Sequence, residues 1–347
     1  MFAIKIGIHA MARTSKDHWR KNYELVKEYF SHAPLYDALC EEVAFYLNHL
    51  IRVAGIKVSS ITKRVKTLDS VLEKVERKQY LRPLQEMTDL AGVRVVCLYL
   101  EDLSRLEEII SQNFLVLEET DKGHEEEDRF GYSSFHYLVK LGRTVSGARY
   151  EDIRDLVCEI QIRTILQNAW AEVAHHLLYK KESEIPKPLR RRIHSLSALL
   201  ENADQQFTDI ATSRREYVDE LSKKGLATKE LLDEGLNRDS LRAFLAKKFP
   251  TLNFSMGDSH ANLVIGNINL SRYRTIGDID RLLQKTEAAW SKYKSNNFAR
   301  SALAYLAIAL GCEDDKFRKS VFFEREASEL IVDYRRALGK PSVIGDG

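Results

Sequence analysis

One short segment of the chain alternates reactive and apolar side chains. In 157–163, Glu159, Gln161 and Arg163 take every second position, and apolar residues fill the positions between them. Successive side chains of a β-strand point to opposite faces, so a strand here places all three polar groups on one face. A strand in a sheet covered on both sides is apolar on both faces, which means that this face borders a cleft or solvent.

A second segment, 131–141, repeats the pattern with other groups. Tyr132, Ser134 and His136 share one face, and the other face is apolar. One interpretation is an amphipathic strand with a solvated face. Because the two segments together offer a carboxylate, an amide, a hydroxyl and an imidazole, we favour a cleft that handles a polar substrate.

Opposite charges surround a third strand, predicted over 91–100. Asp89 precedes it and Arg94 lies within it. An arginine inside an apolar strand is costly unless it is paired or solvated. Two hypotheses follow: an Asp89–Arg94 ion pair at the sheet edge, or a metal-binding carboxylate beside a guanidinium that contacts phosphate or a base.

Basic residues gather around a predicted helix start at Thr67. They are Arg64, Lys66 and Lys74. Alone, such a cluster is typical of a solvated surface. Beside a cleft with two carboxylates, it favours a triphosphate and Mg²⁺ as ligands.

The elements that would position these residues alternate between helix and strand. Apolar spacing predicts helices over 17–56 and from Leu68, 101–112 and 165–179, and strands over 91–100, 114–119, 131–141 and 157–163. Such a mixture over about 130 residues predicts one α/β domain with a mixed sheet flanked by helices.

The rest of the chain is predicted to be mostly helical. Pro186 and Pro188 mark a break, and Gly225 reads as a helix stop. Helices are expected over 241–248, 279–294 and 299–310. We therefore divide the chain into an N-terminal helical region (1–56), a core (57–185), a helical connector (186–225) and a helical C-terminal region (226–347).

Composition excludes some classes of protein. The 347 residues carry a net charge of only +2, and 44% are hydrophobic, so a sizeable core is possible. No apolar run reaches the length of a membrane span. The four cysteines form no C-x-x-C pair, which argues against a zinc ribbon or a disulfide scaffold and predicts buried thiols in a cytoplasmic protein.

Five motifs in a fixed order make the chain resemble the synthetase domain of the RelA/SpoT alarmone family. They are Arg64-Val-Lys-Thr67 followed by Lys74, Asp89-Leu-Ala-Gly-Val-Arg94, Gly131-Tyr-Ser-Ser-Phe-His136, Glu159-Ile-Gln-Ile-Arg-Thr164 and Ala169-Trp-Ala-Glu-Val-Ala-His175. Each is weak alone, but five in order are specific. The resemblance implies a nucleotidyltransferase-like fold and transfer of pyrophosphate from ATP to a ribose 3′-hydroxyl, most simply that of GDP or GTP to give (p)ppGpp.

The resemblance also implies a role for each site residue. The donor ATP would be held by its adenine between two arginines and by its phosphates on two lysines: Arg64, Arg94, Lys66 and Lys74. Mg²⁺ would be bound by Asp89 and Glu159, and Glu159 would also accept the proton of the attacking hydroxyl. The acceptor nucleotide would contact Tyr132, Ser134, His136 and Gln161.

Two departures from the family pattern refine this expectation. No His-Asp dipeptide occurs and little chain precedes Arg64, so we expect synthesis without hydrolysis. Before Gly131 the chain reads His124-Glu-Glu-Glu-Asp-Arg-Phe130, and four carboxylates repel a nucleotide diphosphate.

Alternatives therefore stay open for the acceptor and the role. A toxic member of the family would modify the 3′ end of tRNA or adenosine nucleotides, with Arg190-Arg-Arg192 or Lys223-Lys224 on the tRNA backbone. An inactive nucleotide-sensing module is a third hypothesis. Homo-oligomers, and a regulatory or antitoxin contact through 226–347, are further expectations.

Overall fold

The chain folds into two compact units, Met1–Ala211 and Thr212–Gly347. The division falls inside the connector expected over 186–225. The computed structural model describes residues 19, 22–121, 134–142, 145–177, 186–252, 262, 264–266, 268, 272–293, 301–321 and 323–341. The side chains of 121 and 175–177 are not described. Residues 122–133 thus lie outside the described residues. They include Tyr132, the acidic run 125–128 and the start of the strand expected over 131–141.

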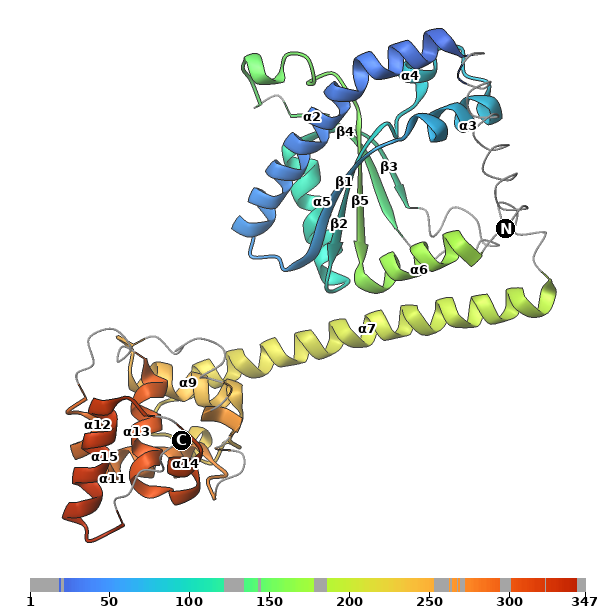
Figure 1. The fold of residues 1–347 in the computed structure, drawn as a ribbon. Helices are drawn as coiled ribbons and strands as arrows, with labels where there is room; N and C mark the ends of the chain where they lie inside the picture. The colour runs from blue at the N-terminus through green and yellow to red at the C-terminus, as the bar shows by residue number, and fades with distance from the viewer. Residues whose placement is uncertain are drawn as a thin grey trace, which may run out of the picture. The chain divides into compact units, whose positions relative to one another are not determined.

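The first unit is an α/β domain (Figure 1). Its helices are α2 (Tyr23–Val53), α3 (Leu68–Lys78), α4 (Pro83–Glu86), α5 (Glu101–Asn113), α6 (Ile165–Leu177) and the larger part of α7 (Lys187–Lys223), with a short 3-10 turn η1 (Ala148–Tyr150). Its strands are β1 (Val58–Val65), β2 (Ala91–Cys97), β3 (Phe114–Asp121), β4 (Phe135–Leu141) and β5 (Cys158–Thr164).

The five strands form one mixed sheet in the order β1-β2-β5-β4-β3. The central pair β2–β5 is parallel, and the other three pairs are antiparallel. The predicted mixed α/β class is therefore confirmed. Strand β1 was not predicted, because Thr62, Lys63 and Arg64 leave this edge strand without an apolar alternation.

Helices α2 and α5 pack on the same side of the sheet (Figure 1). The apolar positions of α2 that face the strands are fully buried, among them Leu39, Val43 and Leu47. The strands supply the other half of this core, for example Ile160 and Ile162 of β5. Because this side takes all the apolar side chains of β5, its polar side chains are left on the opposite side.

Helix α3 begins at Leu68, between Lys66 and Lys74 of the basic cluster. The Thr67 hydroxyl accepts a hydrogen bond from the backbone N–H of Ser70, at 3.4 Å, and so caps the helix as predicted. Leu68, Val71 and Leu72 are buried against the core. This fixes the direction in which Lys74, one turn further on, projects.

The second unit is helical in its described residues. It contains the end of α7, then α8 (Lys229–Leu232), α9 (Arg238–Lys248), α11 (Ile276–Lys285), α12 (Glu287–Trp290), α13 (Ala302–Glu313), α14 (Asp315–Ser320) and α15 (Arg325–Ala337). The almost wholly buried α13 forms the centre of its core. Capping boxes begin α9 and α11.

The helix predicted over 279–294 is two helices. It breaks at Thr286, whose hydroxyl donates to the carbonyl of Leu282 at 2.8 Å, after which α12 begins. A hydroxyl bonded back to the preceding turn competes with the helix ladder, which is why spacing alone overestimated the length. All four cysteines are buried and free, as expected. Within the described ranges, no helix is long and apolar enough to cross a membrane.

Candidate active site

Two rows of side chains cross the polar face of the sheet. The strand register aligns Arg64, Gly92 and Glu159 in one row. The next row runs from Thr62 through Arg94 and Gln161 to His136. Residues paired across neighbouring strands point to the same side, so the sheet itself gathers the predicted side chains.

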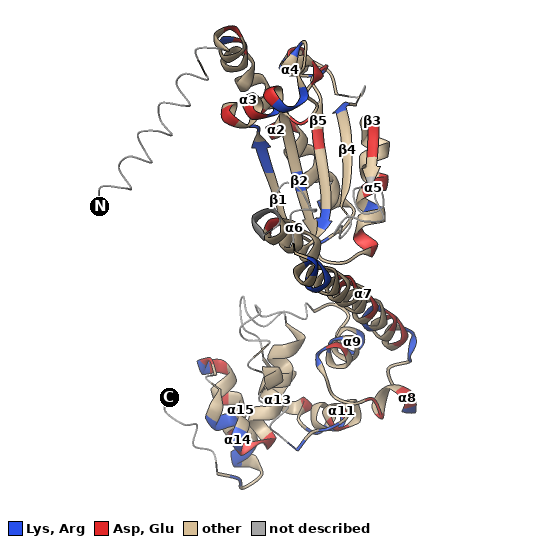
Figure 2. Ribbon diagram, turned by 90° about the vertical axis from the view of Figure 1, so that its right-hand side faces the viewer, with Lys and Arg blue, Asp and Glu red and all other residues tan. Residues whose placement is uncertain are grey.

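A cleft of about 310 Å³ lies over these rows. Asp89 and Glu159 line it together with Arg64, Arg94 and Gln161. Gly92 forms its floor, and a Cβ there would be 3.6 and 3.8 Å from the carbonyl oxygens of Arg64 and Glu159. Figure 2 shows a blue basic stretch on β1 and a red acidic stretch on β5, and the strand order places β2 between the two strands.

Glu159 is held by two hydrogen bonds in the cleft. His136 Nδ1 lies 2.7 Å from its Oε1, and the Gln161 amide donates to its Oε2 at 2.8 Å. Ser134 Oγ lies 3.1 Å from His136 Nε2, which continues the chain of contacts. Both the imidazole and the carboxylate are mostly buried, with side chains 7% and 14% exposed. The arrangement fixes the direction of the Glu159 carboxylate.

Asp89 sits between two ammonium groups. Lys66 Nζ lies 2.7 Å from one carboxylate oxygen and Lys74 Nζ 2.9 Å from the other. Burial raises the pKa of Asp89, but the hydrogen bonds and charges of the two lysines outweigh it and hold the pKa below its usual value. Two ammonium groups facing one carboxylate leave one positive charge on this side of the cleft.

Arg94 is held by three acceptors rather than by Asp89. Its Nε donates to Gln161 Oε1 and one terminal nitrogen to Asn168 Oδ1, both at 3.2 Å. Glu172 lies 3.9 Å from the same guanidinium and accepts from Asn168 at 2.9 Å. The hypothesis of an Asp89–Arg94 ion pair is therefore wrong, because Asp89 pairs with Lys66 and Lys74 while Arg94 binds residues of β5 and α6.

Asn168 and Glu172 were missed as site residues. They lie four positions apart on α6, so they share a helix face. Their place near the site could have been inferred from the sequence, because α6 directly follows β5, the strand that carries Glu159. Trp170 of the same helix is buried.

Arg163 ends the polar row of β5 and is itself buried. Desolvation, and then the charge of Arg94, lower the pKa of its guanidinium to about 10. Its Nε has no hydrogen-bond partner among the described residues. A buried cation next to a second one makes this side of the sheet attractive to anions.

The donor set of the cleft fits Mg²⁺. Mg²⁺ is typically held by one or two carboxylates together with substrate phosphates, and Asp89 and Glu159 face one cleft. No cluster of three or more His, Cys, Asp or Glu side chains exists in the described parts of the chain, so the protein alone offers no closed metal cage. The fit is that of a metal which arrives with its substrate.

Comparison with known proteins shows the family of the chain. A sequence model of the region found in RelA / SpoT proteins matches residues 63–184. The GTP pyrophosphokinase YjbM of Bacillus subtilis is 32% identical over 171 residues, which are 48% of this chain and 78% of that protein. The chain belongs to the RelA/SpoT family.

A second curated relative and a solved structure are also similar to this chain. The GTP pyrophosphokinase YwaC of Bacillus subtilis is 27% identical over 153 residues, covering 42% of this chain and 70% of that protein. The crystal structure of the small alarmone synthetase 1 from Bacillus subtilis covers 55% of this chain and 98% of its own, at 29% identity and a TM-score of 0.46.

Proposed function

We propose that this protein transfers pyrophosphate from ATP to the 3′-hydroxyl of GDP or GTP and so makes (p)ppGpp. Its relatives YjbM and YwaC carry the name GTP pyrophosphokinase, and the match to YjbM covers most of that protein. The observation that carries the proposal is the single cleft that Asp89, Arg64 and Arg94 line together with Glu159, whose carboxylate is oriented by His136.

The donor side of the cleft suits ATP. Arg64 is exposed on β1, and Arg94 lies next to it on β2 with its guanidinium braced. Planar guanidinium groups stack on aromatic bases, so this pair would hold the adenine. Lys66 and Lys74 would leave Asp89 and take the phosphates, because a triphosphate offers them more negative charge than one carboxylate.

The transfer itself needs positioning and charge stabilisation. The acceptor 3′-oxygen attacks the β-phosphorus of ATP, the bond from that phosphorus to the oxygen of the α-phosphate breaks, and AMP leaves. Glu159 would accept the hydroxyl proton, since His136 and Gln161 aim its carboxylate. Asp89 and Glu159 would hold Mg²⁺, which neutralises phosphate charge when bound.

The acceptor side is the part of β4 and β5 next to Glu159. Ser134, His136 and Gln161 lie there, and they would contact the ribose or base of the acceptor. The acidic run before Gly131 favours a second acceptor without a 5′-diphosphate, the 3′-terminal ribose of tRNA. The labelled products of the two acceptors differ in charge, so one assay that resolves the products distinguishes the acceptors.

The test uses ATP labelled at the γ-phosphate. The full chain is incubated with Mg²⁺ and, separately, GDP, GTP, ADP, ATP and deacylated tRNA, and the products are resolved. We expect label on GDP or GTP, and none with Glu159→Gln. Label on tRNA alone would replace the proposed acceptor, and binding of ATP without transfer to any acceptor would refute the reaction.

A further inference from the structure

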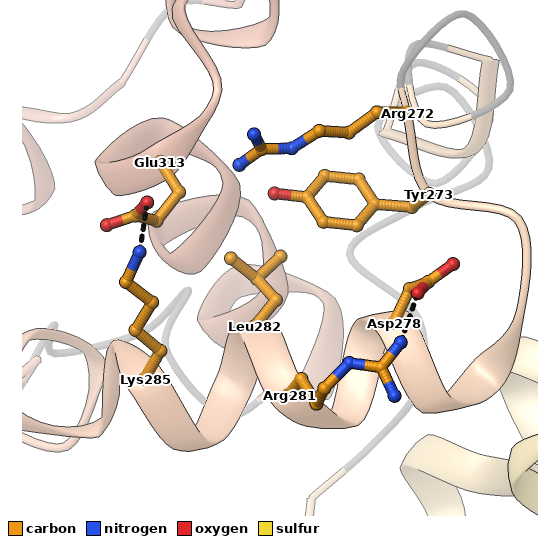
Figure 3. Close-up of a pocket in the computed structure, with 7 residues that line it drawn as sticks. All are labelled: Arg272, Tyr273, Asp278, Arg281, Leu282, Lys285 and Glu313. Atoms are coloured by element: carbon orange, nitrogen blue, oxygen red, sulfur yellow. Dashed lines mark hydrogen bonds and ion pairs between the residues drawn. The ribbon is translucent and has the colours of Figure 1, made fainter.

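The second unit contains a cavity of about 230 Å³, built on one face of α11. Asp278, Arg281, Leu282 and Lys285 of α11 line it, at the i, i+3, i+4, i+7 spacing of a single helix face. Figure 3 shows Arg272 and Tyr273 on the opposite wall and Glu313 at one end. The cavity therefore combines three separate segments of this unit.

The carboxylates of the cavity are already neutralised. Glu313, with its side chain only 4% exposed, is contacted by Lys285 at 2.8 Å and by Lys340 at 2.9 Å. The Tyr334 hydroxyl donates to it at 3.1 Å. Asp278 accepts the backbone N–H groups of two residues before α11 and pairs with Arg281. Neither carboxylate has charge left to attract a cation.

The cationic groups are the exposed ones. The side chains of Arg281 and Lys285 are 72% and 58% exposed, and Arg272 is exposed as well. Arg272 lies over the Tyr273 ring, 5.5 Å from its centroid. The Tyr273 hydroxyl, Asp314 and Glu313 act on its guanidinium and raise its pKa, so it stays a cation. Three lining cations against two lining carboxylates leave one positive charge, which the cavity presents to solvent.

We propose that this cavity is a binding site for a small phosphorylated anion. The guanidinium fork of Arg272 matches the geometry of a phosphate group, and Figure 3 shows the Tyr273 hydroxyl directed into the same space. Lys285 approaches from the other wall as a second cation. Leu282 and the Tyr273 ring offer an apolar surface to the organic part of a phosphate ester.

The size of the cavity limits the ligand. At about 30 Å³ for each water, it holds roughly eight waters. That is the size of inorganic phosphate, pyrophosphate or a small sugar phosphate, and it is smaller than a nucleoside triphosphate. The site lies wholly in the second unit, so the proposal does not depend on the reaction proposed for the first.

The first experiment maps arginine protection in the full chain. Phenylglyoxal modifies exposed guanidinium groups, and mass spectrometry reads each arginine separately. We expect inorganic phosphate and ribose 5-phosphate to protect Arg272 and Arg281, and acetate to protect neither. Arg325, 93% exposed, is the matched control that should react equally throughout. Equal modification of Arg272 with and without both phosphates would overturn the proposal.

The second experiment measures affinity with the catalytic cleft disabled. Lys66→Ala/Lys74→Ala weakens phosphate binding in the first unit, so the further loss caused by Arg272→Ala reports on the second unit. Adding Arg272→Ala should weaken binding of ribose 5-phosphate at least about tenfold, whereas Arg325→Ala should not change it. Arg272→Lys, which keeps the charge, should fall between them. Unchanged affinity in Arg272→Ala would refute the site.

The two phosphate probes distinguish the source of the ligand. Tighter binding of ribose 5-phosphate than of inorganic phosphate would identify a phosphate ester, held also by Leu282 and Tyr273. Equal affinities would identify the phosphate group alone as the ligand.

Discussion

The contact between His136 and Glu159 gives the sharpest prediction. His136→Ala should lower kcat and leave KM for ATP nearly unchanged, because the imidazole contacts the Glu159 carboxylate and the Ser134 hydroxyl on the acceptor side of the cleft. Without the imidazole, the Glu159 carboxylate loses its 2.7 Å contact, while the bond from the Gln161 amide to its other oxygen remains, and it can turn away from the acceptor. His136 would thus act as a positioning residue.

The size of the effect follows from the kind of contact that is lost. The bond is 2.7 Å long and largely buried, and its acceptor is an ionisable carboxyl group. A hydrogen bond to a charged group contributes about 1.5–3 kcal/mol. If the reaction loses that amount in its transition state, kcat falls about tenfold to a hundredfold.

Steady-state kinetics with labelled ATP would measure the change. His136→Asn is the matched control, because its side-chain amide can donate to Glu159 from nearly the position of Nδ1. It should recover most of the lost kcat, and a merely structural role would not give this rescue. Ser134→Ala, one contact further away, should cost less. Wild-type kcat in His136→Ala, or a loss seen only in KM for ATP, would refute the reasoning.

Further predictions concern the donor side and the second unit. Asp89→Asn should abolish turnover; it should also lower the free energy of unfolding at pH 7 by about 1–3 kcal/mol. Although burial raises the pKa of Asp89, its lysine partners hold it below 3.8, so its contribution is present above about pH 4 and lost as pH falls through that lowered pKa. Urea unfolding at pH 7 and pH 3 should show the difference between the two proteins narrowing, and a constant difference would contradict this account. Asn168→Ala should raise KM for ATP several-fold, because Arg94 loses a hydrogen-bond acceptor that holds its guanidinium, and kcat should stay within about twofold. An unchanged KM would mean that this hydrogen bond is not needed to position Arg94. Gly311→Ala should destabilise the second unit by about 1–3 kcal/mol, because a Cβ there would come within 2.9 Å of the Phe323 ring; thermal unfolding would measure it, and an unaltered midpoint would count against tight packing there.

The sequence predicts the strands that have one apolar face and misses the one that has none. Alternation located β5 and β4, since Ile160 and Tyr137 pack in the apolar core while Glu159 and His136 lie on the opposite face of the sheet. β1 is an edge strand with polar residues at successive positions, so no period distinguishes it from a loop.

The site was predicted as a set of residues but not as a set of contacts. Asp89 and Arg94 are close in sequence, yet Asp89 binds two lysines that precede it and Arg94 binds α6. The bond between His136 and Glu159 depends on how β4 is aligned with β5. Register between strands depends on tertiary packing, so it cannot be inferred from one sequence without its fold.

The alternation along β5 also has a consequence for how the domain folds. Strand β5 pairs with β2 on one side and β4 on the other. A slip of one residue would turn Glu159, Gln161 and Arg163 toward the apolar core and expose the isoleucines between them. Burying such groups without partners is prohibitively costly, so incorrect pairings are rejected early. The side chains proposed for chemistry thus also disfavour incorrect strand registers while the sheet forms. Substitutions that make β5 uniformly apolar would make misfolding more frequent as well as removing activity.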